Sequence, residues 1–190
     1  MATIVLLGGN GYIGRSVTKH WLKKDPQAHF WVVSRTGNNK LNDIRIHNVV
    51  ADVTNYEAVV AVIPEKIDYI VDLVGRPEKN DADLELINRV PADVMKKIAE
   101  NYEVKAMGFI GGTLGPKSFT SMKTDIIEQL KKGQIRLEVV EPTLVYGEDR
   151  NDSLSKMVPI FKFLGIFSKG LKPVLVTQLA EELVQKIIRR

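Results

Sequence analysis

Residues 2–7 (ATIVLL) run directly into residues 8–14 (GGNGYIG), and these two segments decide the fold. The first is a near-continuous apolar run, as a buried parallel strand requires. The second carries glycines three residues apart, at Gly8, Gly11 and Gly14, and a helix-forming stretch follows it. A strand, a glycine turn and a helix in this order are typical of a unit that binds a dinucleotide, whose pyrophosphate meets the free N–H groups at the start of the helix.

Each glycine of this loop has a distinct expected role. Gly8 makes the tight turn, Gly11 lets the backbone approach a phosphate, and Gly14 lets the helix lie against the strand. Tyr12 and Ile13 lie between them and complete the predicted cofactor-binding loop. The alternative is a structural glycine turn without a ligand, but the strand before the loop and the helix after it favour the dinucleotide site.

Composition narrows the class of protein. With 190 residues, 44% of them hydrophobic, the chain can bury a core, and the absence of cysteine excludes disulfides and thiolate sites. The three histidines (His20, His29 and His47) show no metal-ligand spacing, so we expect no metal site. The net charge of +4 is spread along the chain, which suits an anionic cofactor but lacks the clustered basic stripe of nucleic-acid binding.

The chain offers no segment for targeting or membrane insertion. The first predicted strand begins at residue 2, and no apolar run approaches the roughly 20 residues of a membrane span. We therefore expect a cytoplasmic protein whose partners are a dinucleotide and either a small-molecule substrate or another protein.

Strands and helices alternate along the sequence. We expect strands at 2–7, 29–34, 46–51, 67–74, 104–110, 135–140 and 172–176, and helices at 15–22, 56–63, 82–101, 121–132 and 178–190. This alternation predicts an α/β fold, a Rossmann-type doubly wound parallel sheet with a small C-terminal lobe. We expect residues 1–150 to form the dinucleotide-binding domain and residues 151–190 to form a lobe that completes the sheet.

In such a sheet the ligand lies at the carboxyl ends of the strands, so the residues just after each strand are candidates. Arg35 follows the second strand, where an acidic residue would accept hydrogen bonds from a ribose 2′-hydroxyl. Because arginine pairs with a 2′-phosphate instead, Arg35, assisted by Lys40, predicts NADP, the alternative being an ordinary solvated arginine. After the third strand, Asp52 can accept from the adenine amino group while Val53 packs on the ring. Asp52 can also cap a helix that begins near Thr54, and both roles can hold.

Leu73, Val74 and Gly75 follow the fourth strand. Their position brings backbone close to a ligand at the same edge of the sheet. The alternative for Gly75 is a simple turn residue.

These segments together resemble the extended and atypical branch of the short-chain dehydrogenase/reductase superfamily, which includes NAD-dependent epimerase/dehydratase-like and NmrA-like proteins. The resemblance covers nearly the whole chain, at residues 8–14, 34–35 (SR), 52–53 (DV), 71–75 (VDLVG), 109–113 (FIGGT), 118–123 (SFTSMK), 141–149 (EPTLVYGED) and 172–176 (KPVLV). It implies NAD(P) binding, with Pro142 and Lys123 among the cofactor-binding residues. Enzymes of the superfamily use a Tyr-x-x-x-Lys pair and an upstream serine; the lysine holds the nicotinamide ribose, and the tyrosine exchanges the proton.

This chain keeps the lysine and lacks the tyrosine. Lys123 is present, but Phe119 occupies the tyrosine position, and Thr113 is the only hydroxyl near the expected serine. The resemblance thus leaves Lys123 and Thr113 as the catalytic candidates. A positioned acid or base contributes about 10²–10⁴ in rate, so we expect ordinary carbonyl chemistry to be severely impaired.

Two functions remain in competition. One is an NADP(H)-binding sensor, assembly factor or interaction module, as NmrA-like regulators and the dehydrogenase-like accessory subunit of respiratory complex I are. The other is an NADPH-dependent oxidoreductase or epimerase-like enzyme that works without the tyrosine. Phe119 favours the first for standard chemistry. A weaker hypothesis is that the aromatic and basic residues of 161–169 (FKFLGIFSK) touch a membrane surface; packing of this segment on the sheet is favoured over it.

Overall fold

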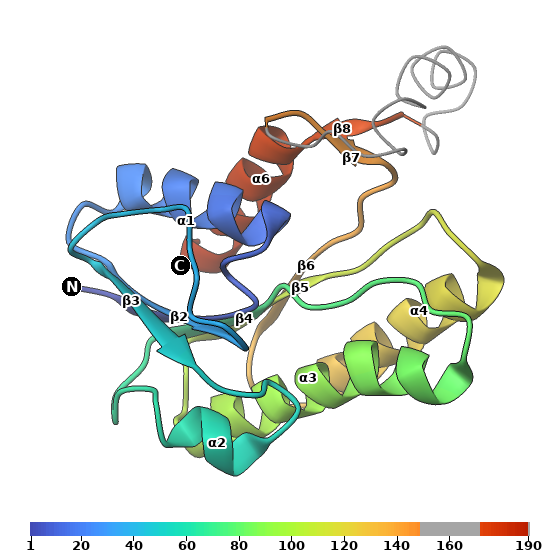
Figure 1. Ribbon diagram of the computed structural model, residues 1–190, viewed down its shortest axis with the longest axis horizontal. Coiled ribbons are helices and arrows are strands. Elements are labelled where there is room, and N and C mark those ends of the chain that lie inside the picture. Colours follow the sequence, from blue (N-terminus) through green and yellow to red (C-terminus); the bar gives the residue numbers. More distant parts are fainter. Residues whose placement is uncertain (149–171, 190) are drawn as a thin grey trace.

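A computed structural model of the chain describes residues 1–148 and 172–189. Its centre is a six-stranded parallel sheet in the order β3-β2-β1-β4-β5-β6, which confirms the predicted Rossmann-type α/β fold (Figure 1). The strands are β1 (Thr3–Leu7), β2 (His29–Ser34), β3 (Ile46–Val50), β4 (Tyr69–Asp72), β5 (Ala106–Ile110) and β6 (Leu137–Val140).

Helices cover both faces of this sheet (Figure 1). One face carries α1 (Tyr12–Lys24) and α6 (Val176–Ile188), which pack against each other. The other face carries α2 (Tyr56–Val60), α3 (Asp81–Asn101) and α4 (Lys117–Lys131). Two short strands, β7 (Val145–Tyr146) and β8 (Val174–Leu175), form a separate parallel pair. No helix in the described ranges is long and apolar enough to cross a membrane.

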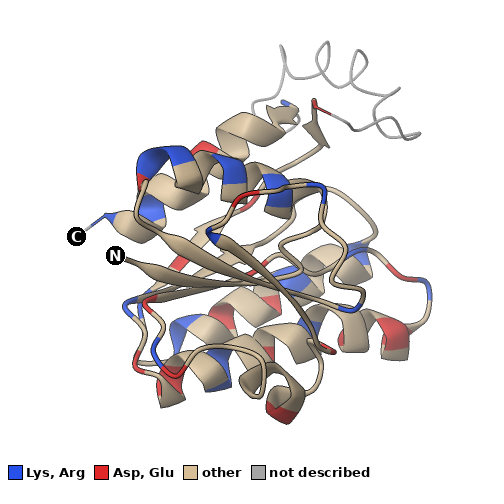
Figure 2. Ribbon diagram, turned by 60° about the vertical axis from the view of Figure 1, so that its left-hand side comes forward, with Lys and Arg blue, Asp and Glu red and all other residues tan. Residues whose placement is uncertain are grey.

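The alternation of side chains along β1 builds a core on each face of the sheet. Val5 and Leu7 belong to the core beneath α3 and α4, whereas Ile4 and Leu6 belong to the core beneath α1 and α6. Charged residues lie mostly on the helices and loops (Figure 2). Within the central strands β1, β4 and β5 the single charged residue is Asp72.

Strand β1 is where the order of the sheet reverses. It pairs with β2 on one side and with β4 on the other. The chain leaves β1 through α1 on one face and leaves β4 through α3 on the opposite face. The loops after these strands therefore diverge, and a crevice opens at their carboxyl ends, where ligands bind in doubly wound sheets.

Two boundaries differ from the sequence prediction in ways that matter. Helix α4 begins at Lys117 instead of 121, so Phe119 and Lys123 lie one turn apart on the same helix. Residues 172–176, predicted as one strand, contribute only β8 and then the start of α6; β8 pairs with β7 and does not extend the main sheet. The division into residues 1–150 and 151–190 stays a prediction, because residues 149–171, including the 161–169 segment, lie outside the described residues.

The contact of Gly14 with the glycine loop generates a prediction about stability. A Cβ at Gly14 would lie 2.5 Å from the carbonyl oxygen of Gly9 and 2.6 Å from its Cα, so backbone would have to move. We expect Gly14→Ala to lower the free energy of unfolding by about 1–3 kcal/mol. The control is Gly133→Ala, whose Cβ would first meet the flexible Glu100 side chain at 3.2 Å and should change stability by less than about 0.5 kcal/mol. Urea unfolding measures both, and equal midpoints would contradict the expectation.

Candidate functional site

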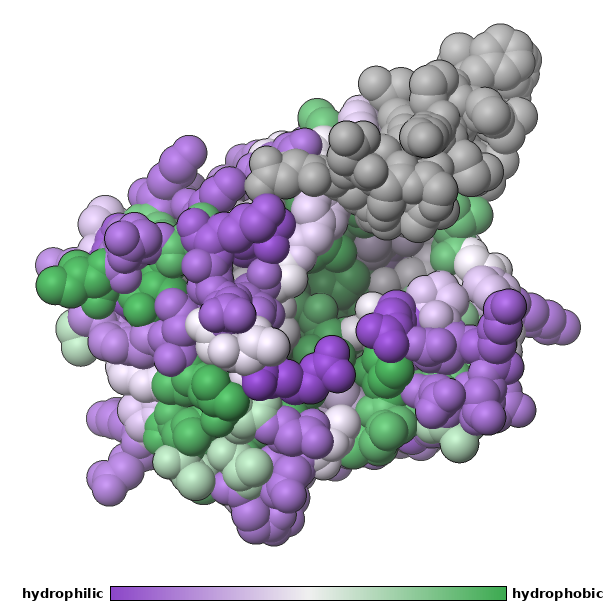
Figure 3. All heavy atoms as spheres, in the orientation of Figure 1, coloured by the Kyte–Doolittle hydropathy of each residue, from purple (hydrophilic) through white to green (hydrophobic). Residues whose placement is uncertain are grey.

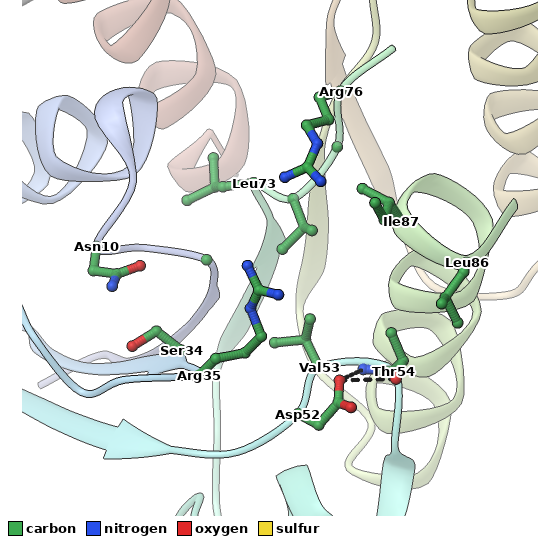
Figure 4. A pocket seen from close by; sticks show the side chains of 13 residues that line it. Asn10, Ser34, Arg35, Asp52, Val53, Thr54, Leu73, Arg76, Leu86 and Ile87 are labelled. Carbon is green, nitrogen blue, oxygen red and sulfur yellow. Dashed lines mark hydrogen bonds between the residues drawn. The ribbon is translucent and has the colours of Figure 1, made fainter. Parts of the chain in front are cut away.

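Two adjoining cavities occupy the crevice at the carboxyl ends of the strands. On the face shown in Figure 3 the molecule is hollowed between its two helical layers, with hydrophobic residues in the hollow and hydrophilic ones around it. The first cavity encloses about 340 Å³. Its lining comes from the loops after β1 to β4 and from α3: Gly8, Asn10, Ser34, Arg35, Asp52, Val53, Thr54, Leu73, Val74, Gly75, Arg76, Leu86 and Ile87 (Figure 4).

The second cavity, of about 230 Å³, continues from the first toward α4. Residues 73–76, the segment just after β4, line both cavities. The other lining residues of the second cavity are Ile13, Pro77, Ile110, Gly111, Gly112, Leu114, Phe119, Lys123, Pro142 and Thr143. The two cavities therefore form one elongated site that crosses the point where the sheet order reverses.

The glycine loop and the start of α1 supply Gly8, Asn10 and Ile13 to the lining of these cavities. Gly8 has a φ of +73°, a conformation that favours glycine, and its N–H donates to the carbonyl of Val33 at 2.9 Å. Gly11 is the N-cap of α1, which has neither a side-chain cap nor an acidic residue in its first turn. Asparagines cap α2 and α3, whereas α4 and α6 begin, like α1, without a side-chain cap or an acidic residue in the first turn. A helix N-terminus without a side-chain cap or an acidic residue is a favourable place for an anion.

The predicted loop residues divide into those at the cavities and those that support them. Gly8 lines the first cavity and Ile13 the second. Among the described residues, an added Cβ at Gly11 would meet only the carbonyl oxygen of Gly8, at 3.1 Å. Tyr12 and Gly14 line neither cavity: the Tyr12 hydroxyl donates to the carbonyl of Gly147 at 2.7 Å, and Gly14 packs on the loop backbone.

Arg35 and Asp52 approach the first cavity from neighbouring strand ends. Figure 4 shows the Arg35 side chain directed into the cavity from the end of β2. Asp52 Oδ1 accepts from the Thr54 N–H at 3.0 Å and from its hydroxyl at 2.8 Å. These bonds, and to a lesser degree the charge of Arg35, hold the pKa of Asp52 below its usual range. The alternative that Asp52 caps the helix is wrong, because the cap is Asn55, whose side chain accepts from the Ala58 N–H.

Arg76 is a residue that the sequence prediction missed. It follows Gly75 directly, lines both cavities and keeps its side chain 62% exposed. Its Nε donates to Glu78 at 2.5 Å, and Figure 4 shows Arg76 together with Arg35 among the side chains that line the first cavity. Residues that directly follow a strand of such a sheet are expected to line the site, and this rule also applies to Arg76. Lys40, by contrast, is exposed and is not among the lining residues.

Lys123 and Phe119 of α4 meet the second cavity. The Lys123 side chain is buried, with its Nζ 4.5 Å from the centre of the Phe109 ring and 5.8 Å from that of Phe119. Thr113 lines neither cavity, and its hydroxyl donates to the carbonyl of Pro142 at 3.3 Å. All five tyrosines of the chain lie in its described part, and none of them lines either cavity.

Beneath Gly75 lies a buried polar cluster of Asp72, Asn88 and Lys123, two of which sequence reasoning did not include in the site. Asp72 Oδ1 accepts from the Val74 N–H at 2.9 Å, while Asp72 Oδ2 and Asn88 Oδ1 have no hydrogen-bond partner among the described residues. Gly75 has a φ of +140°, and a Cβ there would lie 2.6 Å from Asn88 Oδ1 and 2.7 Å from Lys123 Nζ. The signals in the sequence were a carboxylate inside an apolar strand and an asparagine inside a helix.

Burial dominates the electrostatics of this cluster. It raises the pKa of Asp72 to about 7, although the charge of Lys123 and the Val74 N–H oppose the shift. Burial also lowers the pKa of Lys123, and the charge of Asp72 opposes that shift. The cluster therefore contains a carboxyl group that titrates near neutral pH.

This titration predicts how stability depends on pH. The pKa of Asp72 is about 7 in the folded chain against the ordinary 3.8, so the native state binds the extra proton between these values. Protonation of Asp72 stabilises the folded state fully below about pH 4. This contribution decreases as the pH rises and is lost once the pH has passed about 7. Relative to Asp72→Asn, the wild type should therefore lose up to about 4 kcal/mol of unfolding free energy between pH 4 and pH 8.

Asp68→Asn is the control for this measurement. Burial raises the pKa of Asp68, but its bonds to Lys105 and to the Thr3 N–H outweigh that effect and leave the pKa below its usual range. Its contribution to stability is therefore lost as the pH falls through the acidic range, and it should not change between pH 5 and 8. Denaturant unfolding across this range measures both variants, and parallel profiles for Asp72→Asn and the wild type would refute the assignment.

The sequence of the chain matches a known protein family. Residues 4–113 match the model of the NAD dependent epimerase/dehydratase family. No curated protein matches the chain by sequence.

Solved structures match over almost the whole chain at low identity. UDP-glucose 4-epimerase matches with a TM-score of 0.76 and 12% identity over 97% of this chain and 72% of its own. The enzyme WbmH of Bordetella bronchiseptica in complex with NAD⁺ matches with a TM-score of 0.73 and 13% identity over 98% and 72%. A variant of ElxO in which a tyrosine is replaced by phenylalanine, with NADPH bound, matches with a TM-score of 0.75 and 16% identity over 98% and 91%. At these identities the likeness shows a shared fold.

Proposed function

Since this chain belongs to the NAD-dependent epimerase/dehydratase family, we propose that it binds NADP(H) across the two adjoining cavities and acts as a sensor, assembly factor or interaction module. The observation that carries the cofactor proposal is the uncapped N-terminus of α1 at Gly11, open to an anion beside the cavities. The pyrophosphate would meet these N–H groups. The adenosine half would lie between Arg35, Asp52 and Val53, and the nicotinamide half would lie toward Lys123.

Preference for the 2′-phosphorylated cofactor rests on the charges at the end of β2. Arg35 stands where a carboxylate would bind a ribose 2′-hydroxyl, and its guanidinium is directed into the first cavity (Figure 4). Arg76 adds a second guanidinium to the lining of the same cavity. Two cations around one cavity favour a ligand with several phosphate charges.

The first test is the selectivity of binding. We expect NADPH to bind at least several-fold more tightly than NADH, and Arg35→Ala to weaken NADPH binding by roughly tenfold or more while leaving NADH nearly unchanged, since a charge-assisted hydrogen bond contributes about 1.5–3 kcal/mol. Titration calorimetry measures both affinities. Lys40→Ala, at an exposed lysine that does not line the cavity, serves as the control. Equal affinities of the wild type for the two cofactors would rule out the proposed selectivity.

Gly11→Val gives the matching loss-of-site variant. Among the described residues, a Cβ at Gly11 would meet the carbonyl oxygen of Gly8, at 3.1 Å, so the protein should stay folded. The same side chain would fill the space proposed for the pyrophosphate, so both cofactors should lose binding. Intact binding in this variant would reject the loop as the phosphate site.

The absence of a phenol at the nicotinamide end supports a binding role over standard catalysis. Phe119 lines the second cavity one helical turn before Lys123, and no tyrosine of the chain lines either cavity. In ElxO, replacement of a tyrosine by phenylalanine is compatible with bound NADPH. A protein of this fold can therefore bind NADPH after one of its tyrosines is replaced by phenylalanine.

A second function is favoured by one observation. The buried cluster of Asp72, Asn88 and Lys123 places ionisable groups beside the second cavity although the tyrosine is missing. An NADPH-dependent oxidoreductase or epimerase-like enzyme could use such groups, or water, to manage a proton.

Turnover separates these two functions. We expect wild-type protein to consume NADPH with aldehydes, ketones and quinones at well below about 1 s⁻¹, the lower end of common enzymatic rates. Phe119→Tyr restores a phenol one turn from Lys123 and should raise the rate, whereas the control Phe119→Leu should not. Lys123→Ala should weaken cofactor affinity in either background. Wild-type turnover above about 1 s⁻¹ would favour the enzyme and reject the binding module.

A further inference from the structure

Three buried polar groups from three different elements lie together at the end of β4. Asp72 is on β4, Asn88 on α3 and Lys123 on α4, with exposures of 0%, 0% and 3%. Asn88 Oδ1 and Lys123 Nζ both lie within 2.7 Å of the point where a Cβ of Gly75 would stand. The glycine therefore keeps these two atoms at the strand end that both cavities share.

The charges in this cluster are only loosely compensated. Within the described part of the chain no ion pair within 4.0 Å joins Asp72 to Lys123, and Asp72 Oδ2 has no hydrogen-bond partner. Asn88 is held by its amide group, which donates to the carbonyls of Arg76 at 2.9 Å and Leu84 at 3.0 Å. A buried carboxylate with one free oxygen and a distant cation is costly to keep charged.

The surroundings supply few other charges. In the sheet Asp72 lies between Leu7 of β1 and Phe109 of β5, and neither of these strands carries a charged residue. From α4, the positive charge of Lys123 lowers the pKa of Asp72. From α3, the cluster receives the neutral amide of Asn88. Arg76, at the strand end, is largely exposed and paired with Glu78. Asp72 and Lys123 therefore determine each other's charge.

We propose that Asp72 and Lys123 form one proton-binding site beneath Gly75, which takes up a proton when a dinucleotide fills the adjoining cavities. The inference rests on the proposed binding of NADP(H). An anionic ligand in a water-poor site strengthens the preference for positive charge nearby, so it favours the state in which Asp72 is neutral and Lys123 remains an ammonium. The raised pKa of Asp72, about 7, places this exchange in the neutral range.

This site holds a proton near the nicotinamide end when a dinucleotide is bound, although no tyrosine lines the cavities. Proton uptake on binding means that affinity rises as the pH falls. NADH affinity should accordingly be several-fold higher at pH 6 than at pH 8. Asp72→Asn should remove this dependence because asparagine does not titrate.

Titration calorimetry in two buffers of different ionisation enthalpy measures the proton directly. NADH is the main probe, because the 2′-phosphate of NADPH titrates in the same range; NADPH is compared between wild type and variant, where that contribution cancels. We expect the wild type to take up a substantial fraction of one proton per NADH at pH 7, and Asp72→Asn to take up none. Asp68→Asn, whose carboxyl contacts Lys105 and the Thr3 N–H away from both cavities, should behave as the wild type.

Each outcome is decisive. Binding without proton uptake, or with the same uptake in Asp72→Asn, overturns this inference and leaves the proposed function standing. Failure of both dinucleotides to bind overturns the proposed function and this inference with it. If Asp72→Asn does not fold, Lys123→Met is measured in its place. The positive charge of Lys123 opposes protonation of Asp72, so its removal should move the proton uptake on binding to higher pH. The same pH dependence of proton uptake in Lys123→Met and the wild type would refute the shared site.

Discussion

Helix α1 starts after a loop of only four residues, 8–11, because the backbone of Gly14 rests directly on that of Gly9. This close approach fixes the direction in which the helix leaves β1. It also aims the uncapped N-terminus of α1 at the edge where β1 and β4 diverge. A larger residue at Gly14 would separate helix and loop, and the helix dipole would no longer point at the crevice.

The two ends of the site differ in their exposure to water. At the first cavity, Arg35 and Arg76 are exposed cations, of which Arg76 is paired with Glu78, so keeping these charges costs little. At the second cavity, Lys123 and Asp72 are buried, so their charge states respond strongly to what lies next to them. Exposed cations at one end favour an anionic group, whereas the buried groups at the other end respond to the charge of a neighbour.

Phe119 and Gly75 determine the surroundings of the buried Lys123 at the second cavity. The phenylalanine supplies packing without a hydroxyl beside Lys123, so the polar partners of the lysine must come from elsewhere in the fold. Gly75 leaves room for Asn88 Oδ1 and Lys123 Nζ at the strand end. The polar groups near Lys123 are thus a buried carboxylate on β4 and a buried amide on α3.

The sequence by itself determined the parallel sheet, its strand positions and the glycine loop, because apolar runs, glycine spacing and helix periodicity are local properties. It also determined that Arg35, Asp52 and Gly75 each come just after a strand. Only the tertiary structure decided that Arg76 and Arg35 line the same cavity, that the Thr113 hydroxyl donates to the Pro142 carbonyl, and that Asp72, Asn88 and Lys123 meet. Those three residues lie on different elements, separated by 16 positions between Asp72 and Asn88 and by 35 between Asn88 and Lys123. Their encounter depends on how α3 and α4 pack on the sheet, and no local pattern in the chain encodes that packing.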